Sequence, residues 1–262
     1  MGTITSTSFS ADYIGNEDNR YYSDSARQSW KPANVWSWLW PGKTSQHVTV
    51  SGGMIQTGDD VSGNSRNWAK YADVSGLRYT SSLNFEDQDW ATDLPVLQGL
   101  ELATSATIEL LSPLNATGEF YLGHAVFNSR GLGNRYMFGG DTIDNTVRLL
   151  QENNALEINV AGGGLTTIAL NGFAQGPEFW LPFFLEIWRD ASNVVHVAIN
   201  MEEVGTNPEI SGTFQISQFG GGPWGGSAKW DDFVLEFWVA TAVPTARERT
   251  DAYNYLRVKW GF

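Results

Sequence analysis

The chain has 262 residues, of which 42% are hydrophobic and 13% aromatic, enough apolar material for one large packed domain. Its formal net charge of −13 argues against binding to the phosphate backbone of nucleic acids and against anionic membrane surfaces. The absence of cysteine excludes disulfides, thiolate nucleophiles and cysteine-based metal sites. We therefore expect no nucleic-acid partner and no membrane insertion.

The N-terminal segment is polar and acidic, with few apolar anchors. Residues 1–10 have neither the basic start nor the apolar run of a secretory signal, and no later run is long enough to span a membrane. We expect an extended arm over residues 1–34 and a single domain over residues 35–262. The arm is interpreted either as a surface segment or as a tether that orders on a partner.

The first half of the domain alternates short apolar stretches with irregular ones. Trp30 to Trp40 has the period-two pattern of a strand, with Trp36, Trp38 and Trp40 on one face. This indole face is interpreted as buried packing rather than as an exposed sugar-stacking platform. A short strand follows at residues 47–50, and Phe85 to Trp90 forms an acidic loop.

From residue 119 onward, short strands separated by Gly- and Asn-rich turns follow one another quickly. The expected strands cover residues 120–127, 135–138, 146–150, 156–160, 166–170, 183–189, 194–200 and 210–216. His124 is the only titratable side chain in the first of them, and we interpret it as a core histidine.

The last thirty residues combine a strand with a helix. Residues 233–240 alternate with period two and carry a single charge, which indicates a central strand covered on both faces. Thr245 and Glu248 have the spacing of a capping box that opens a helix. Tyr253, Leu256 and Trp260 then recur at helical spacing, and we expect these three to form a clasp that seals one end of the fold.

At least ten short strands and one C-terminal helix predict an all-β fold, an antiparallel jelly-roll β-sandwich. The ending Tyr255-Leu-Arg-Val-Lys-Trp-Gly261 resembles that of the concanavalin A-like or laminin-G-like jelly-roll domains found in phage structural and surface proteins. Weaker matches are residues 67–76, residues 97–102 and the hairpin over residues 189–204, where Met201 replaces the usual Gly of an Asn-Gly turn. The resemblance covers roughly residues 35–262.

No catalytic constellation emerges, so we expect a protein that is not an enzyme. Retaining glucanases with this fold carry Glu-x-Asp-x-x-Glu on one strand, and that run is missing from the sequence. Glu186 and Asp190 have a spacing that places them on one strand face, but Asp190 lies at a turn. Because of this pair, a glycoside hydrolase remains the less favoured alternative. The sequence also lacks a Gly-x-Ser-x-Gly elbow and a phosphate-binding Gly-x-x-x-x-Gly-Lys loop.

Two kinds of binding site have candidates. Because members of the resembled family often hold Ca²⁺ in loops, Ca²⁺ is a candidate ligand, although no cofactor is required. The candidate Ca²⁺ ligands are the loop carboxylates Glu86, Asp87, Asp89, Asp231 and Asp232, with Asp59 and Asp60 as a further pair. Sugar recognition needs an exposed aromatic ring beside polar groups, for which Trp224 in a Gly-rich loop is the first candidate and Trp90 and Asn134 follow.

The resemblance and the missing catalytic pair favour a non-enzymatic virion structural protein of a phage. We expect a head-decoration or tail-surface protein, and we expect this protein to adhere to host or environmental glycans. Its expected partners are other virion proteins, reached through the arm or a sheet edge, a second copy of the chain, and polysaccharide. The expected location is the virion surface, after synthesis in the host cytoplasm. The alternative is a secreted, extracellular carbohydrate-binding module.

Overall fold

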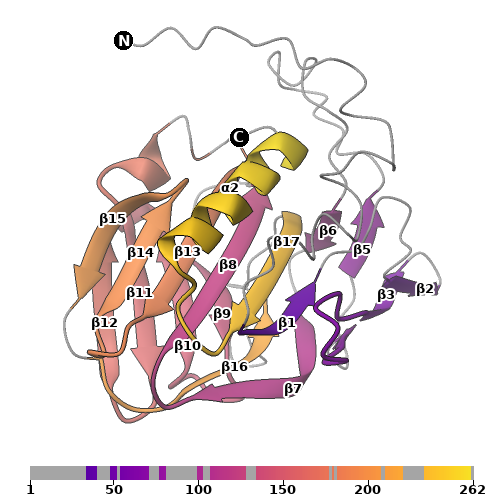
Figure 1. The fold of residues 1–262 in the computed structure, drawn as a ribbon, viewed down its shortest axis with the longest axis horizontal. Helices are drawn as coiled ribbons and strands as arrows, with labels where there is room; N and C mark the ends of the chain where they lie inside the picture. Colours follow the sequence, from indigo (N-terminus) through magenta and orange to yellow (C-terminus); the bar gives the residue numbers. More distant parts are fainter. Residues whose placement is uncertain are drawn as a thin grey trace, which may run out of the picture.

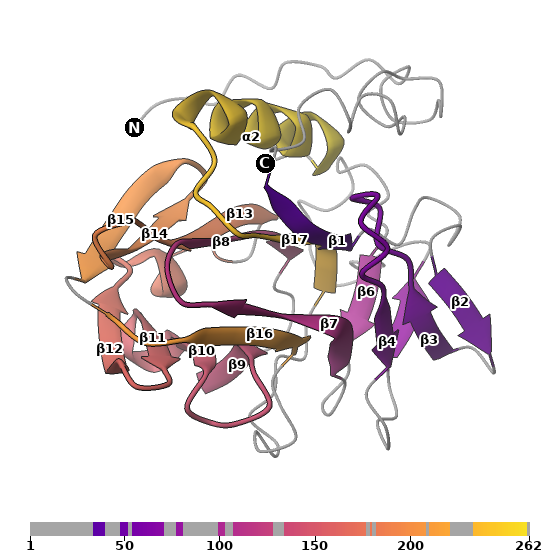
Figure 2. The same cartoon turned by 60° about the horizontal axis from the view of Figure 1, so that its bottom comes forward.

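The computed structural model describes residues 34–39, 48–51, 54–70, 77–80, 99–102, 107–127, 134–176, 179, 182–207, 210–220 and 233–260. In this part of the chain, two antiparallel β-sheets face each other, and one long helix lies across the outside of one sheet (Figures 1 and 2). The expected N-terminal arm lies outside the described residues.

The sheet under the helix is called sheet A, and the other is called sheet B. In spatial order, sheet A contains β15 (Glu202–Asn207), β14 (Val195–Ile199), β13 (Phe183–Arg189), β8 (Phe120–Phe127), β17 (Phe233–Ala240), β6 (Gly99–Leu102) and β5 (Leu77–Thr80), and β1 (Val35–Leu39) also pairs with β17. Sheet B contains β12 (Gly164–Ala169), β11 (Ala155–Val160), β10 (Thr146–Leu150), β9 (Asn134–Gly139), β16 (Phe214–Phe219), β7 (Ile108–Ala116), β4 (Trp68–Lys70), β3 (Met54–Gly58) and β2 (Val48–Ser51). Two short 3-10 helices, η3 (Gln151–Asn153) and η4 (Phe173–Gln175), connect strands.

The main core lies between the sheets and is built by alternate residues of each strand. Val147 and Leu149 of β10 and Leu185 and Ile187 of β13 all belong to this core, and all four side chains are nearly inaccessible to solvent. Burial of this apolar surface is the main force that holds the sheets together. The residues between these positions therefore point to the outer faces, where a functional site can form.

A second apolar cluster fills the space between sheet A and the C-terminal helix, α2 (Ala246–Trp260). From the sheet it contains Trp238 and Phe184, whose rings stack with centroids 5.4 Å apart. From the helix it contains Tyr255 and Leu256, both fully buried. Because Phe237 faces the main core, strand β17 is covered on both faces, as its low charge predicts.

The start of α2 has the expected capping box. The Glu248 amide donates to the Thr245 hydroxyl at 3.2 Å, and the Glu248 carboxylate accepts from the Thr245 amide at 2.8 Å. Of the proposed clasp residues, Leu256 is buried, Tyr253 is half-buried against the second cluster, and the side chain of Trp260 lies outside the described part. The helix lies across the outer face of sheet A rather than at an end of the sandwich, because that face offers the apolar surface its buried residues need.

Several expected strands have the predicted bounds, and other regions differ, among them β3, β4 and β5, which were not expected from the sequence. Residues 120–127, 146–150 and 183–189 match β8, β10 and β13. The strand expected at residues 210–216 begins instead at Phe214, because Gly212 has a φ of +93° that interrupts extended structure before it. Strand β7 has no counterpart in the sequence analysis. It contains Pro113, which lies where the pairing with β16 is irregular, the position at which a sheet tolerates proline.

The hairpin between β14 and β15 turns through two residues with positive φ. Asn200 has a φ of +50° and Met201 a φ of +73°. Asparagine followed by glycine is the usual pair for such a turn, so a methionine with its Cβ adds local strain. Asn200 compensates in part, since its side-chain oxygen accepts a hydrogen bond from the Phe184 amide at 2.9 Å.

Arg189, at the end of β13, joins the loops at one end of the sandwich. Its buried guanidinium donates to the carbonyl oxygens of Gly118 and Ala116 at 2.7 and 2.9 Å, and to those of Ile210 and Gly212 at 3.1 and 3.0 Å. Burial lowers the pKa of Arg189 from its ordinary value. Because the guanidinium is hydrogen-bonded to backbone carbonyl oxygens, we assign Arg189 a structural role.

Candidate functional site

The two outer faces of the sandwich differ in what covers them. Helix α2 lies over strands β13, β8 and β17 of sheet A. In the part of the chain that the structure describes, no helix lies over sheet B. Among the described residues, the outer face of sheet B is therefore the sheet surface that a helix leaves open.

Beneath α2, Glu186 is fully buried and has three hydrogen-bonding contacts. It accepts from the Tyr121 hydroxyl at 2.6 Å and from the Arg249 guanidinium at 2.7 and 3.0 Å. Burial raises the pKa of Tyr121 well above its usual value, and the adjacent Glu186 carboxylate raises it further. Burial would lower the pKa of Arg249, but its bonds to Glu186 raise it overall. Glu186 thus anchors the helix to the sheet.

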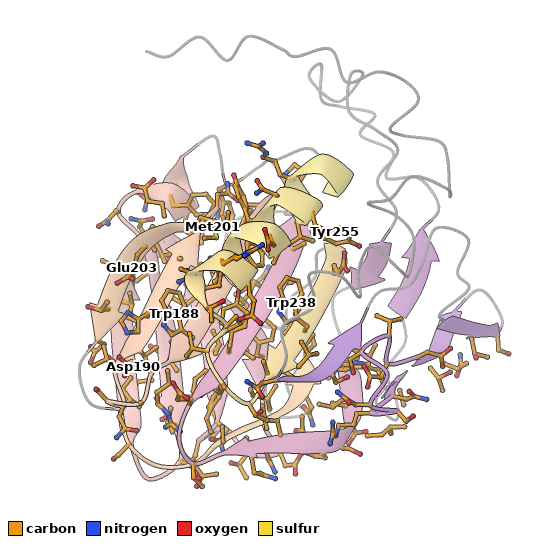
Figure 3. All side chains as sticks on the ribbon, viewed as in Figure 1. Trp188, Asp190, Met201, Glu203, Trp238 and Tyr255 are labelled. Carbon is orange, nitrogen blue, oxygen red and sulfur yellow. The ribbon has the colours of Figure 1, made fainter. Side chains whose placement is uncertain are left out.

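Trp188 extends this anchor toward the free edge of sheet A. The Arg249 guanidinium lies 4.0 Å from the centroid of one Trp188 ring, and the His196 ring stacks on Trp188 at 4.8 Å and 3°. Figure 3 shows Trp188 near the start of α2, with Asp190 and Glu203 closer to the edge. The two carboxylates contact different His196 nitrogens, Asp190 at Nε2 (3.3 Å) and Glu203 at Nδ1 (3.2 Å). They therefore hold the imidazole from both sides and do not converge on a common point.

On the outer face of sheet B, three side chains from neighbouring strands form a row. Tyr136 of β9 lies opposite Arg148 of β10, which lies opposite Glu157 of β11. The Arg148 guanidinium is 5.4 Å from the Tyr136 ring centroid, and its Nη2 is 2.8 Å from Glu157 Oε1. Tyr136 is half-buried, while the side chains of Arg148 and Glu157 are 28% and 15% exposed. The row is held in place and still reaches solvent.

Polar and apolar side chains extend this face on either side of the row. Exposed Thr167 of β12 pairs with Glu157, and half-buried Asn159 of β11 pairs with Leu165, which is 60% exposed. The Asn159 side-chain amide donates to the Ile143 carbonyl at 3.1 Å. The surface therefore offers an aromatic ring, hydroxyl and amide groups, a charged pair and two exposed aliphatic side chains, those of Leu165 and Ile143.

Asn134, a sugar-binding candidate from the sequence, lies two residues before Tyr136 on the same face of β9. Its Oδ1 is buried and has no hydrogen-bond partner among the described residues, and the same holds for Arg148 Nε on the adjacent strand. Both atoms lie just below the surface, so a ligand reaches them only if the side chains turn. An acceptor and a donor with unmet hydrogen bonds thus lie beside Tyr136.

The other sequence candidates are mostly outside the described residues. This holds for the aromatic candidates Trp224 and Trp90 and for the proposed calcium ligands Glu86, Asp87, Asp89, Asp231 and Asp232. Both residues of the further pair are described, and Asp59 is exposed. The Asp60 carboxylate accepts from the Ser62 amide (2.9 Å), the Ser62 hydroxyl (2.8 Å) and the Arg66 amide (2.9 Å). These hydrogen bonds fix the conformation of the loop that contains Asp60. Within the described ranges, no cluster of three or more His, Asp or Glu side chains is arranged to hold a metal ion.

Sequence reasoning placed Tyr136 and Glu157 in strands and assigned neither of them, nor Arg148, to a site. The available signal was a polar or aromatic residue at alternate positions of three neighbouring short strands. Only the register of the three strands shows that these residues lie side by side. That register contains a bulge between Val147 and Arg148, which places Arg148 opposite Tyr136 instead of Met137.

The described architecture is that of an antiparallel jelly-roll β-sandwich with a C-terminal helix. None of its helices, within the ranges described, is long and apolar enough to cross a membrane. No protein-family model matches the chain, and no curated protein sequence matches it.

Solved structures do resemble it. One is domain 4 of AbnA, a GH43 extracellular arabinanase from Geobacillus stearothermophilus, solved in complex with arabinotriose. The TM-score is 0.56 at 13% identity, over 84% of this chain and 98% of that one. Because the identity is low, the likeness shows the fold alone.

Two further neighbours belong to longer chains. The ligand-binding domain of botulinum neurotoxin serotype D, in complex with N-acetylneuraminic acid, has a TM-score of 0.54 at 11% identity, over 84% of this chain and 50% of that one. Trypanosoma rangeli sialidase, in complex with 2,3-difluorosialic acid, has a TM-score of 0.54 at 10% identity, over 87% of this chain and 34% of that one. The chain thus spans about half of the toxin domain and a third of the sialidase. None of the three is described as a phage protein.

Proposed function

We propose that this domain binds carbohydrate, without cleaving it, through the outer face of sheet B around Tyr136. The observation that carries the proposal is the fold match with a domain of almost the same extent whose structure contains arabinotriose. Two further neighbours were solved with sialic acid or a derivative of it. A fold alone does not define a function, and sugar binding also requires a surface with suitable chemistry.

The row of Tyr136, Arg148 and Glu157 offers that chemistry. Sugar rings have an apolar C–H face that stacks on an aromatic ring, and hydroxyl groups that both donate and accept hydrogen bonds. The Tyr136 ring offers the stacking surface, and the ion pair beside it offers a donor and an acceptor in fixed positions. Because the pair is already ordered, little side-chain entropy is lost when a sugar binds.

The proposed role is non-catalytic, since a glycosidase needs two carboxylates facing one substrate-sized cleft. Glu186 and Glu236, the buried carboxylates of β13 and β17, are fully covered. Glu186 is bonded to Tyr121 and Arg249, and Glu236 lies 3.4 Å from the Tyr255 hydroxyl under α2. This arrangement supports binding over hydrolysis.

The neighbours favour glycan binding over the virion role that the sequence resemblance suggested first. A virion role rests on that resemblance alone, and Ca²⁺ binding rests on carboxylates outside the described residues. Display of the domain outside a cell, on a particle or as a secreted module, fits a glycan-binding function and forms part of the proposal.

The test is calorimetric titration with arabinotriose, preceded by a glycan array to find other ligands. Tyr136→Ala should reduce the affinity about tenfold or more, because stacking on an aromatic ring is lost, whereas Tyr136→Phe should keep most of it. Leu111→Ala is the matched control, since it removes a 58% exposed apolar side chain from β7 of the same sheet. Equal affinity for Tyr136→Ala and wild type would place the site elsewhere, and Trp224→Ala tests the loop predicted from the sequence.

A further inference from the structure

The charges on the outer face of sheet B bear on the kind of glycan that it accepts. The segment from β9 to η4, residues 134–176, contains two arginines, Arg135 and Arg148, and four carboxylates, Asp141, Asp144, Glu152 and Glu157. The whole chain has a net charge of −13. A ligand with a carboxylate therefore approaches a chain of net negative charge, and it needs a cation on this face to hold it.

Arg148 is the cation in the row, and Glu157 already occupies it. Nη2 of Arg148 lies 2.8 Å from Oε1 and 3.0 Å from Oε2 of Glu157, and the guanidinium lies against the Tyr136 ring. Because both Glu157 oxygens contact the same nitrogen, the carboxylate neutralises the guanidinium charge at the point where an anionic ligand would bind. A ligand carboxylate would have to displace Glu157, and the freed Glu157 would then repel it.

We propose that this face selects neutral glycans over carboxylated ones, and that Glu157 is the residue that sets the selection. The inference rests on the proposed function, because it concerns the same surface. Hydroxyl groups of a neutral sugar need no displacement of Glu157, since they donate to its oxygens and accept from the exposed part of the Arg148 guanidinium. The ion pair then forms hydrogen bonds with sugar hydroxyl groups and does not bind a ligand carboxylate.

The test compares ligands that differ only in charge. Arabinotriose is the neutral probe, and N-acetylneuraminic acid and its methyl ester form a pair with and without the carboxylate charge. Titrations are performed with wild type, with Glu157→Gln, and with Glu152→Gln. The last variant is the matched control, because it removes the same charge from an exposed residue of η3 that does not contact Arg148.

Wild type should bind arabinotriose, and it should bind the ester more tightly than the acid. Glu157→Gln should gain affinity for the acid by about tenfold at low salt, the size of one charge-assisted hydrogen bond at a partly exposed site. It should lose affinity for arabinotriose, because the amide has one acceptor oxygen fewer and no longer pairs with the Arg148 charge. The gain should shrink at high salt because the charges are screened. Glu152→Gln should behave as wild type.

The outcomes separate the two proposals. If wild type binds arabinotriose while the acid binds as tightly as the ester, or if Glu157→Gln gains no affinity for the acid, the selection is wrong and glycan binding stands. If wild type binds none of these probes or any glycan on the array, the proposed function itself is wrong, and the selection falls with it.

Discussion

His124 should make the fold sensitive to acid. It lies in the main core with no exposed surface, and the rings of Phe219, Phe138 and Phe237 surround it at centroid distances of 4.8, 5.4 and 6.0 Å. Neither ring nitrogen has a hydrogen-bond partner among the described residues. Burial among aromatic rings disfavours the charged imidazolium and lowers the pKa of His124 from 6.5 to about 3.

The free energy involved follows from this pKa difference. As the pH falls below 6.5, the unfolded chain binds a proton at His124, whereas the folded protein does not bind one until about pH 3. The contribution to stability is therefore fully present above pH 6.5 and is lost progressively down to about pH 3. At about 1.36 kcal/mol per pH unit, the loss is about 3 kcal/mol at pH 4 and about 5 kcal/mol in total. That is a large part of the stability of an ordinary domain.

The assay is urea unfolding followed by tryptophan fluorescence at pH 7 and at pH 4. Wild type should lose about 3 kcal/mol more between these pH values than His124→Phe does, because phenylalanine suits the aromatic cluster and does not titrate. Equal losses for wild type and His124→Phe would refute the reasoning. The comparison within one protein removes the contribution of the carboxylates, which titrate in both forms.

Two further predictions concern the hairpin tip and the helix anchor. Met201→Gly should stabilise the protein by about 1 kcal/mol in chemical unfolding, because glycine adopts a φ of +73° without strain; a loss of stability would mean that the Met201 side chain contributes contacts that outweigh the strain. Arg249→Ala should destabilise by about 3 kcal/mol, since it leaves the Glu186 carboxylate buried without its cation and removes the cation from Trp188. The Arg247→Ala control changes an arginine that is 91% exposed on the same helix and should cost less than about 0.5 kcal/mol; similar losses for both would exclude a specific anchor.

Much of the fold could be predicted from local patterns. The strands at residues 120–127, 146–150 and 183–189 are apolar runs bounded by turn residues, and their bounds agree with the structure. The capping box at Thr245 also needs only local spacing, because both of its hydrogen bonds lie within four residues. Strand β7 escaped prediction because Pro113 normally marks the end of a strand, and only the irregular pairing with β16 accommodates it.

The site depended on information that local patterns lack. Tyr136, Arg148 and Glu157 are separated in sequence by turns, and their neighbourhood is set by the register of β9, β10 and β11. A regular ladder would place Arg148 opposite Met137, and only the bulge brings it to Tyr136. Glu186 is a second example. Its position in a strand could be predicted from the sequence, but its burial under helix α2, which follows much later in the chain, could not.

The most direct test of glycan binding on sheet B is an amide NMR titration of the ¹⁵N-labelled protein with arabinotriose. The account predicts saturable shift changes centred on the amides of Asn134, Tyr136, Arg148 and Glu157, with the strands under α2 unaffected. Saturable changes confined to β13, β14 and α2, or no changes with any ligand found on the array, would contradict it.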